Sequence, residues 1–159
     1  MNKILVVYFS YTGNTRKIAN LIKDKLPCDI LELKPVIAYN TDYQTVVDEE
    51  QKMEGTNHMP EIKDINVDLS LYETIIIGTP VWWYTISPVI RTFLNKYDIS
   101  GKNIYFFATN AGWLGKTFIE FQKECKGNVI SSQNIVFESY SDKLITKQDE
   151  INNWIMGIR

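Results

Sequence analysis

The sequence predicts an α/β protein, in which an open parallel sheet is covered by helices. Near-continuous apolar runs at residues 4–9, 75–78 and 104–108 are typical of strands buried on both faces of a parallel sheet. Between these runs lie segments whose apolar residues recur with helical spacing. Because strands and helices alternate along the chain, we expect each strand to pair with parallel neighbours.

Size and charge narrow the class of protein. The 159 residues, 18.5 kDa, are enough to bury one full core, so we expect a single domain over residues 1–159. A net charge of −2 argues against nucleic acid or an anionic membrane as a partner. No apolar run approaches the roughly 20 residues that span a bilayer, and the N-terminus lacks a signal-peptide pattern. Cys28 and Cys125 stand far apart, which indicates reduced thiols in a cytoplasmic protein and no metal site.

Five strands are expected, at residues 4–9, 29–33, 75–78, 104–108 and 129–137. The mixed composition of residues 29–33 predicts an edge strand. Two apolar pieces, 129–130 and 135–137, flank the polar residues 131–134. We therefore expect a break within the last strand.

Four helices are expected between and after these strands. Their apolar stripes are Ile18, Ala19, Ile22 and Leu26; Ile90, Phe93, Leu94 and Tyr97; Leu114, Phe118, Phe121 and Cys125; and Ile151, Trp154, Ile155 and Ile158. Ser87 followed by Pro88 predicts an N-cap and a first helical residue. Thr146 is predicted to cap the last helix.

Residues 34–72 form a long connection between the second and third strands, predicted as an insertion within the domain. Thr41 and Gln44 resemble a capping box at the start of a further helix. The acidic run at 48–50 is interpreted as the solvated side of that helix rather than as a metal site. His58, the only histidine, could act there as a proton donor over a pocket, although a lone surface histidine is more often incidental.

Ligands of open parallel sheets bind at the carboxyl ends of the strands, where three loops have unusual compositions. The first loop, Ser10-Tyr11-Thr12-Gly13-Asn14-Thr15, offers four hydroxyls and one amide around a single glycine. It leads into a helix N-terminus, which favours anions. Helix capping with a turn glycine would explain one or two of these hydroxyls. The whole set favours a phosphate held mainly by hydrogen bonds.

The second and third loops favour a flat ring beside that phosphate. The second, Pro80-Val81-Trp82-Trp83-Tyr84-Thr85, has three consecutive aromatic residues. Since they cannot all point into one core, at least one should face a cleft and could stack on a heterocycle. In the third, Thr109-Asn110-Ala111-Gly112-Trp113-Leu114-Gly115, small residues let the backbone approach a ligand, although a plain turn would look similar.

These motifs resemble those of the flavodoxin family. The first loop is similar to the flavodoxin phosphate loop [S/T]-x-T-G-N-T. Residues 79–83 and 87–94 resemble a bacterial flavodoxin subfamily with P-x-W-W before a P-x-x-x-x-F-L helix, and residues 39–60 resemble its extra segment. The third loop matches only loosely, because Trp113 and Leu114 replace smaller residues.

The resemblance implies a flavodoxin-like three-layer sandwich of the short-chain form, with a five-stranded parallel sheet in order 2-1-3-4-5 and FMN at the switch point. It assigns the phosphate to Ser10, Thr12, Asn14 and Thr15, within a loop that includes Tyr11 and Gly13. It places the flavin ring between Pro80 to Tyr84 (with Val81, Trp82 and Trp83) and Thr109 to Gly112 (with Asn110 and Ala111). No side chain needs a catalytic role, because the flavin carries the redox chemistry.

Three functions remain open at this point. An electron carrier would exchange electrons with redox partner proteins, whereas a reductase would pass electrons from a nicotinamide to a small quinone-like acceptor. A non-redox flavin-binding module is the third alternative. The resemblance favours the carrier, but the three loops contain no Asp or Glu, unlike the acidic surroundings of electron-carrying flavodoxins. We expect a monomer or a weak dimer.

Overall fold

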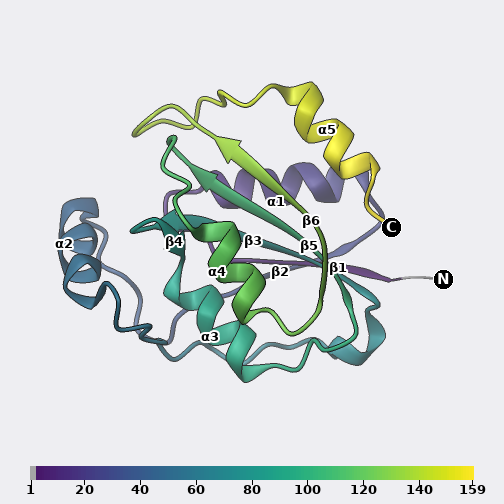
Figure 1. Ribbon diagram of the computed structural model, residues 1–159, viewed down its shortest axis with the longest axis horizontal. Coiled ribbons are helices and arrows are strands. Elements are labelled where there is room, and N and C mark those ends of the chain that lie inside the picture. The colour runs from purple at the N-terminus through teal and green to yellow at the C-terminus, as the bar shows by residue number, and fades with distance from the viewer. Residues whose placement is uncertain (1–2) are drawn as a thin grey trace.

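The computed structural model describes residues 3–159 and contains one sheet with five parallel strands. These strands are β1 (Ile4–Tyr8), β2 (Asp29–Glu32), β3 (Thr74–Trp82), β5 (Asn103–Asn110) and β6 (Asn128–Val136). They lie in the order β2-β1-β3-β5-β6, with parallel pairing throughout (Figure 1). Counted along the chain, this is the order 2-1-3-4-5, so the predicted fold class is confirmed.

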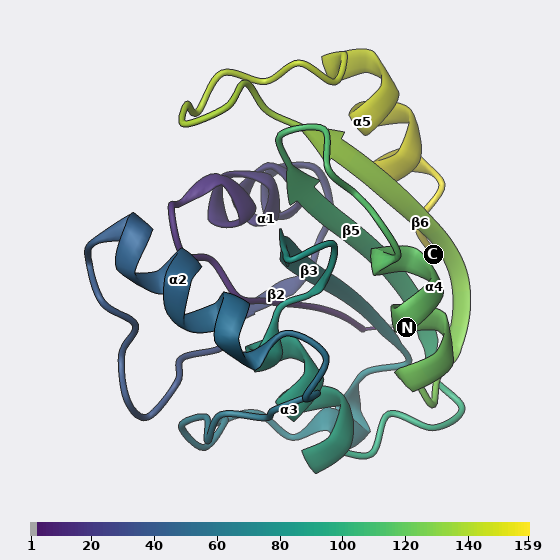
Figure 2. The same ribbon diagram turned by 60° about the vertical axis from the view of Figure 1, so that its left-hand side comes forward.

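Helices cover both faces of this sheet and make the three layers. They are α1 (Asn14–Lys25), α3 (Pro88–Lys96), α4 (Thr117–Glu124) and α5 (Gln148–Met156). The insertion adds helix α2 (Tyr43–Met53), which is not part of these layers, and a short 3-10 helix, η1 (Leu69–Leu71). Helices α1 and α5 contribute to one buried cluster and α3 and α4 to the other, and Figure 2 shows the two pairs on opposite sides of the strands.

Strand β1 is apolar on both of its faces because helices cover both faces of the sheet. Leu5 and Val7 belong to the core on the α3 and α4 side, whereas Ile4 and Val6 belong to the core on the α1 and α5 side. Successive side chains of a strand point to opposite faces, so both faces require apolar residues when both are covered.

The last strand, β6, is continuous, and the predicted break at residues 131–134 is wrong. Ser131 to Asn134 pair with Tyr105 to Ala108 of β5, and the irregularity is a register shift one step earlier. Polar side chains are tolerated at this sheet edge because they find partners. Trp154 Nε1 donates to Ser131 Oγ at 2.8 Å, and Asn110 Nδ2 donates to Asn134 Oδ1 at 2.7 Å.

A two-residue antiparallel strand, β4 (Thr85–Ile86), was not predicted. It pairs with the end of β3 through a tight turn formed by Trp83 and Tyr84. Both turn residues have positive φ, 50° and 65°, as the central residues of a type I′ turn require. Such turns usually contain Asn-Gly or Asp-Gly, so two aromatic residues gave no turn signal.

The helix starts agree in part with the sequence. Ser87 is the N-cap of α3 and Pro88 its first residue, as predicted. Helix α2 starts one residue later than expected, because Asp42 rather than Thr41 accepts the capping bond, from the N–H of Thr45. The prediction for Thr146 is wrong. Its Oγ1 accepts the N–H of Val136 at 2.7 Å, and α5 begins after Lys147.

Helix α2 belongs to the insertion and lies beyond the carboxyl ends of the strands (Figure 1). It therefore stands beside the loops that follow β1, β3 and β5 rather than against the sheet. Within residues 3–159, no helix is long and apolar enough to cross a membrane.

Candidate functional site

The first loop is folded as a cradle at the start of α1. Ser10 Oγ accepts hydrogen bonds from the N–H groups of Gly13 and Arg16, each at 3.2 Å. Gly13 has φ +105°, which favours glycine, and no protein atom beyond its two chain neighbours lies within 4 Å of the position of an added Cβ. The other N–H groups at the helix start lack intrahelical partners, as at any helix N-terminus. The loop thus presents donors beside open space.

Two predicted phosphate ligands use their side chains to connect loops. Thr15 is buried, and its Oγ1 lies 2.8 Å from Thr109 Oγ1 of the third loop. Asn14 Nδ2 donates to the carbonyl of Ser141 at 2.9 Å, which ties α1 to the segment after β6. Thr12 remains an exposed hydroxyl at the rim of the cleft described below. A phosphate bound at the first loop would therefore contact Thr12 and backbone N–H groups rather than the side chains of Asn14 and Thr15.

The second loop places its three aromatic residues around a cleft. Trp82 packs edge-on against Phe9, Tyr11 and Tyr39, with ring centroids 4.8–5.8 Å apart. Trp83 Nε1 donates to the carbonyl of Val47 in α2 at 3.3 Å. Trp83 and Tyr84 both have positive φ, and because neither is glycine this conformation costs about 1–3 kcal/mol for each residue. Such strain is common where a side chain must face a ligand.

The third loop is braced by Asn110 and joined to the second loop. Asn110 Oδ1 accepts the N–H groups of Gly112 and Trp113, at 2.9 and 3.1 Å. Lys116 N–H donates to the carbonyl of Tyr84 at 2.8 Å. Gly115 has φ +56°, and a Cβ there would lie 2.4 Å from Tyr84 Cβ. The close contact between the two loops requires glycine at this position.

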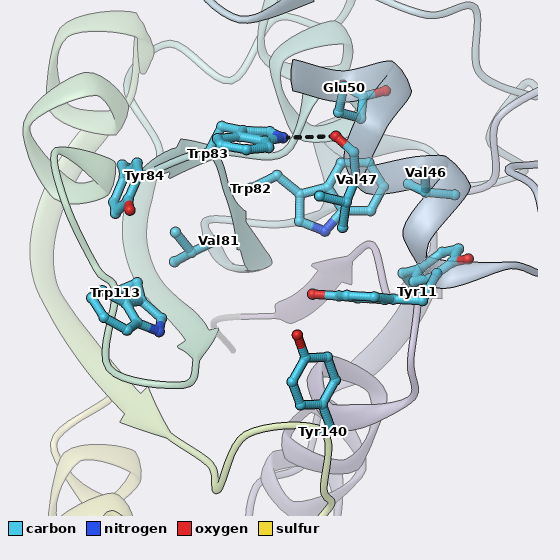
Figure 3. A pocket seen from close by; sticks show the side chains of 11 residues that line it. Tyr11, Val46, Val47, Glu50, Val81, Trp82, Trp83, Tyr84, Trp113 and Tyr140 are labelled. Carbon is cyan, nitrogen blue, oxygen red and sulfur yellow. Dashed lines mark hydrogen bonds between the residues drawn. The ribbon is translucent and has the colours of Figure 1, made fainter. Parts of the chain in front are cut away.

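Two adjoining compartments open between these loops. The larger, about 560 Å³, is lined by the first and third loops, the end of β3 and residues 137–142. The smaller, about 380 Å³, is lined by α2 and by Trp83 and Tyr84 (Figure 3). The two share a wall made of Tyr11, Tyr43, Val81, Trp82, Trp113 and Tyr140.

The structure gathers most of the predicted site residues around these compartments. Those that line the larger compartment are Tyr11, Thr12, Asn14, Pro80, Val81, Trp82, Thr109, Asn110 and Ala111. Trp83 and Tyr84 line the smaller one. The predicted residues that line neither are Ser10, Gly13, Thr15 and Gly112. Ser10 and Thr15 shape the site through the hydrogen bonds given above.

Sequence reasoning missed the residues that come from outside the three loops. Tyr140, which has φ +55° and is 93% exposed, lies at the mouth of both compartments. Tyr43 contacts it, with ring centroids 5.7 Å apart. Trp113 lies within the third loop but outside the predicted set of site residues, and it lines both compartments.

Carboxylates line the site, although the three loops themselves contain no Asp or Glu. Glu138 and Asp142, from the segment after β6, line the larger compartment. Glu50 of α2 lines the smaller one, where burial and then the charge of Glu49 raise its pKa. The surroundings of the site are therefore more acidic than the three loops indicate.

His58 lies behind Glu50 rather than over the cleft. Its Nε2 is 3.6 Å from Glu50 Oε2, and it lines neither of the two compartments. Burial, followed by the positive charge of Arg91, lowers the pKa of His58. Among residues 3–159, no group of three or more His, Cys, Asp and Glu side chains is placed to hold a metal ion.

The sheet order and the position of the compartments define the class of protein. In doubly wound sheets, ligands bind at the carboxyl ends of the strands, at the point where the strand order reverses. A sheet in order 2-1-3-4-5 with its binding loops at that point is the flavodoxin-like arrangement. A family model described as flavodoxin matches residues 3–157. The chain belongs to the flavodoxin family.

Solved structures show the same fold. A flavoprotein from Lactobacillus acidophilus NCFM in complex with FMN is 25% identical, with a TM-score of 0.78 over 97% of this chain and 99% of that chain. The NMR structure of the apo-form of the flavoprotein from the same organism is 22% identical, with a TM-score of 0.63 and 97% of each chain covered. Oxidised flavodoxin 1 from Bacillus cereus is 15% identical, with a TM-score of 0.54 over 98% and 93% of the two chains. Among curated proteins, none matches this chain.

Proposed function

We propose that this protein binds FMN in the larger compartment and serves in electron transfer. The observation that carries the proposal is the composition of that compartment from one end to the other. It runs from Thr12 and Asn14, at the positive end of α1, to Trp82 and Asn110 at the ends of β3 and β5. Anions bind well at a helix N-terminus, and flat rings stack well on aromatic walls. A phosphate joined to a planar heterocycle fits both ends.

Each part of the site has a distinct task in this proposal. Thr12 and the N–H groups of the first loop hold the phosphate, while Ser10 and Thr15 keep that loop in shape. Trp82 and the backbone of Asn110 and Ala111 orient the ring and exclude water. Bound FMN supplies the redox chemistry, because a flavin can take up and release one or two electrons.

The first prediction is that the protein binds FMN at least about 100-fold more tightly than riboflavin, a difference of about 2.7 kcal/mol. The phosphate, which riboflavin lacks, would collect the hydrogen bonds at the start of α1. Titration of apoprotein with each flavin, followed by the quenching of flavin fluorescence, gives both affinities. Equal affinities would contradict a phosphate site in the first loop.

The carboxylates support a carrier that donates electrons at low potential. Negative charges near a flavin disfavour the additional negative charge of its reduced form. We expect the double variant Glu138→Gln/Asp142→Asn to make full reduction easier by about 0.5–1 kcal/mol, since both side chains are exposed and partly screened. Redox titration in low salt measures this change. Glu73→Gln, exposed before the amino end of β3, is the matched control and should leave the potential unchanged.

A reductase is the second candidate, and the smaller compartment is the observation that favours it. A carrier needs an exposed flavin edge, whereas a reductase also needs space for a second small molecule. Anaerobic mixing of oxidised holoprotein with NADH or NADPH separates the two. Bleaching of the flavin within seconds would support the reductase. An unchanged spectrum, together with ready photoreduction, would support the carrier.

Location and partners complete the proposal. Cys28 and Cys125 are free thiols, which suits a cytoplasmic protein. Exposed aromatic residues and carboxylates around the cleft suit either a redox partner protein or a small acceptor as the electron-transfer partner.

A further inference from the structure

A groove at the carboxyl ends of β1 and β2 lies outside both compartments. Its volume is about 580 Å³, and it is bounded by the first loop, the end of β2 and the insertion. Apart from Tyr11, Thr12 and Tyr43, none of its lining residues lines either compartment. We call this space the basic groove, after the side chains of Lys34 and Lys63 that line it.

The basic groove and the larger compartment lie on different sides of β1. Strand β1 is placed between β2 and β3. The groove takes residues from the end of β2, whereas the larger compartment takes them from the ends of β3 and β5. Tyr11 stands at the boundary, where its Oη donates to the carbonyl of Asn40 and its ring contacts those of Tyr39 and Tyr43, at centroid distances of 6.4 and 6.2 Å. A ligand in the basic groove would therefore not occupy the proposed FMN site.

The basic groove carries positive charge in a protein whose net charge is −2. Arg16, Lys34 and Lys63 line it, and Glu32 is the one carboxylate among its described lining residues. Arg16 forms an ion pair with Glu32. Within residues 3–159, neither lysine has an ion-pair partner or a side-chain hydrogen bond. The groove is therefore left with two uncompensated ammonium groups, which favour an anionic ligand.

The backbone holds these two lysines opposite each other. Lys63 N–H donates to the carbonyl of Lys34 at 2.8 Å, and Pro35 and Ile62 form an antiparallel bridge one step further on. Ile62 is 2% exposed and anchors this bridge in the core. Directly opposite residues of an antiparallel pair have their side chains on the same face, and like charges in such positions are destabilising. A bound anion would relieve this repulsion.

The rest of the basic groove combines an apolar floor with an acceptor for hydroxyl groups. Phe9 and Leu33, just after β1 and β2, are 4% and 2% exposed and form the floor. Glu32 is the last residue of β2 and lies 19 positions after Gly13. In doubly wound dinucleotide-binding proteins, an acidic residue about 20 positions beyond the glycine loop binds a ribose hydroxyl. A carboxylate has about four acceptor sites, so the two existing hydrogen bonds of Glu32 leave room for another.

We propose that the basic groove binds a nucleoside monophosphate, as a site additional to FMN. Such a ligand has one part for each feature of the groove. Its phosphate, a dianion, lies between Lys34 and Lys63, its ribose hydroxyls donate to Glu32, and its flat base covers the apolar floor. The site is made of residues that the proposed FMN site does not use for the flavin ring, so the inference does not depend on FMN.

The experiment compares a complete ligand with its two halves on FMN-loaded, oxidised protein. Adenosine 5′-monophosphate is the probe, and adenosine and inorganic phosphate are the halves. Equilibrium dialysis at about pH 7.5, where a phosphate monoester is mostly a dianion, gives the three affinities. We expect the monophosphate to bind at least about tenfold more tightly than either half, because only the monophosphate reaches both the lysines and Glu32. Flavin absorbance in the dialysed protein shows whether FMN stays bound.

Two pairs of lysine substitutions test the charge. Lys34→Gln/Lys63→Gln should weaken the monophosphate at least about tenfold and keep the affinity for FMN within about threefold. Lys123→Gln/Lys126→Gln is the matched control, because it changes the net charge by the same amount. Both control lysines are exposed, at the end of α4 and before β6, and neither lines the basic groove. The control pair should leave both affinities unchanged.

A further pair of variants tests the space. Ala38 is exposed and lines the basic groove, so Ala38→Trp should obstruct it and weaken the monophosphate at least about tenfold. Ile37→Trp is the control, because Ile37 is the preceding residue, is 86% exposed and does not line the groove. It should change neither affinity.

The outcomes separate this inference from the proposed function. Absence of monophosphate binding, equal binding of inorganic phosphate, or equal losses in the two lysine pairs would each overturn the inference. Release of FMN by the monophosphate overturns it too, since both would then share the site at the start of α1. If the protein binds no FMN but binds the monophosphate with the same dependence on Lys34, Lys63 and Ala38, the proposed function fails and the basic groove stands as a nucleotide site.

Discussion

Gly13→Val should reduce the affinity for FMN at least about 100-fold, or about 2.7 kcal/mol, while the protein still folds. Gly13 has φ +105°, a conformation in which a β-branched residue is strongly disfavoured. Relief of that strain would turn the N–H groups of the first loop away from their present directions. Apart from residue 13 and its two chain neighbours, no protein atom lies within 4 Å of the position of the new Cβ, so the core would not be disturbed. The loss should therefore fall mainly on ligand binding.

Gly101→Val is the matched control for this result. Gly101 also has positive φ, +77°, and open space around it, but it precedes the amino end of β5, remote from the carboxyl-end loops. Gly101→Val should lower the free energy of unfolding by about 1–3 kcal/mol, the cost of the same backbone strain, and should leave the affinity for FMN unchanged. Flavin titration and urea unfolding of both variants measure the two effects. Unchanged FMN affinity in folded Gly13→Val would rule out the first loop as the phosphate site.

The parts of the fold that local patterns determine could be predicted from the sequence. The run at 4–9 is apolar on both faces because two pairs of helices cover the sheet, and this pattern is visible without coordinates. The three loops could be identified because parallel strands place their carboxyl ends at one edge. Thr15 and Thr109, 94 positions apart in the chain, meet there at 2.8 Å.

The parts that depend on distant partners could not be predicted. The polar residues 131–134 stay in β6 because Trp154 and Asn110 supply hydrogen bonds to it. The turn at Trp83 and Tyr84 is held by contacts with α2 and the third loop rather than by turn propensity. The cover supplied by α2 and Tyr140, and the carboxylates of Glu138 and Asp142, come from segments whose composition gives no binding motif.

The contact between the second and third loops leads to the prediction with the largest effect on stability. In Gly115→Ala, the new Cβ would lie 2.4 Å from Tyr84 Cβ and 2.6 Å from the Tyr84 carbonyl oxygen. The backbone of a strained turn cannot retreat as a flexible side chain could. The left-handed conformation of residue 115 costs an alanine about 1–2 kcal/mol, and the overlap adds about 1–3 kcal/mol.

We therefore expect Gly115→Ala to lower the free energy of unfolding by about 2–5 kcal/mol and to weaken FMN at least tenfold. Separation of the loops would break the hydrogen bond from Lys116 N–H to the Tyr84 carbonyl and move Trp83 away from Val47. Gly55→Ala is the control, because Gly55 has φ +80° with no atom within 4 Å. It should show only the conformational cost. Urea unfolding and flavin titration of both variants test this result. If the two variants lose equal stability, the contact between the loops does not depend on glycine at position 115, and the two walls of the cleft are held independently.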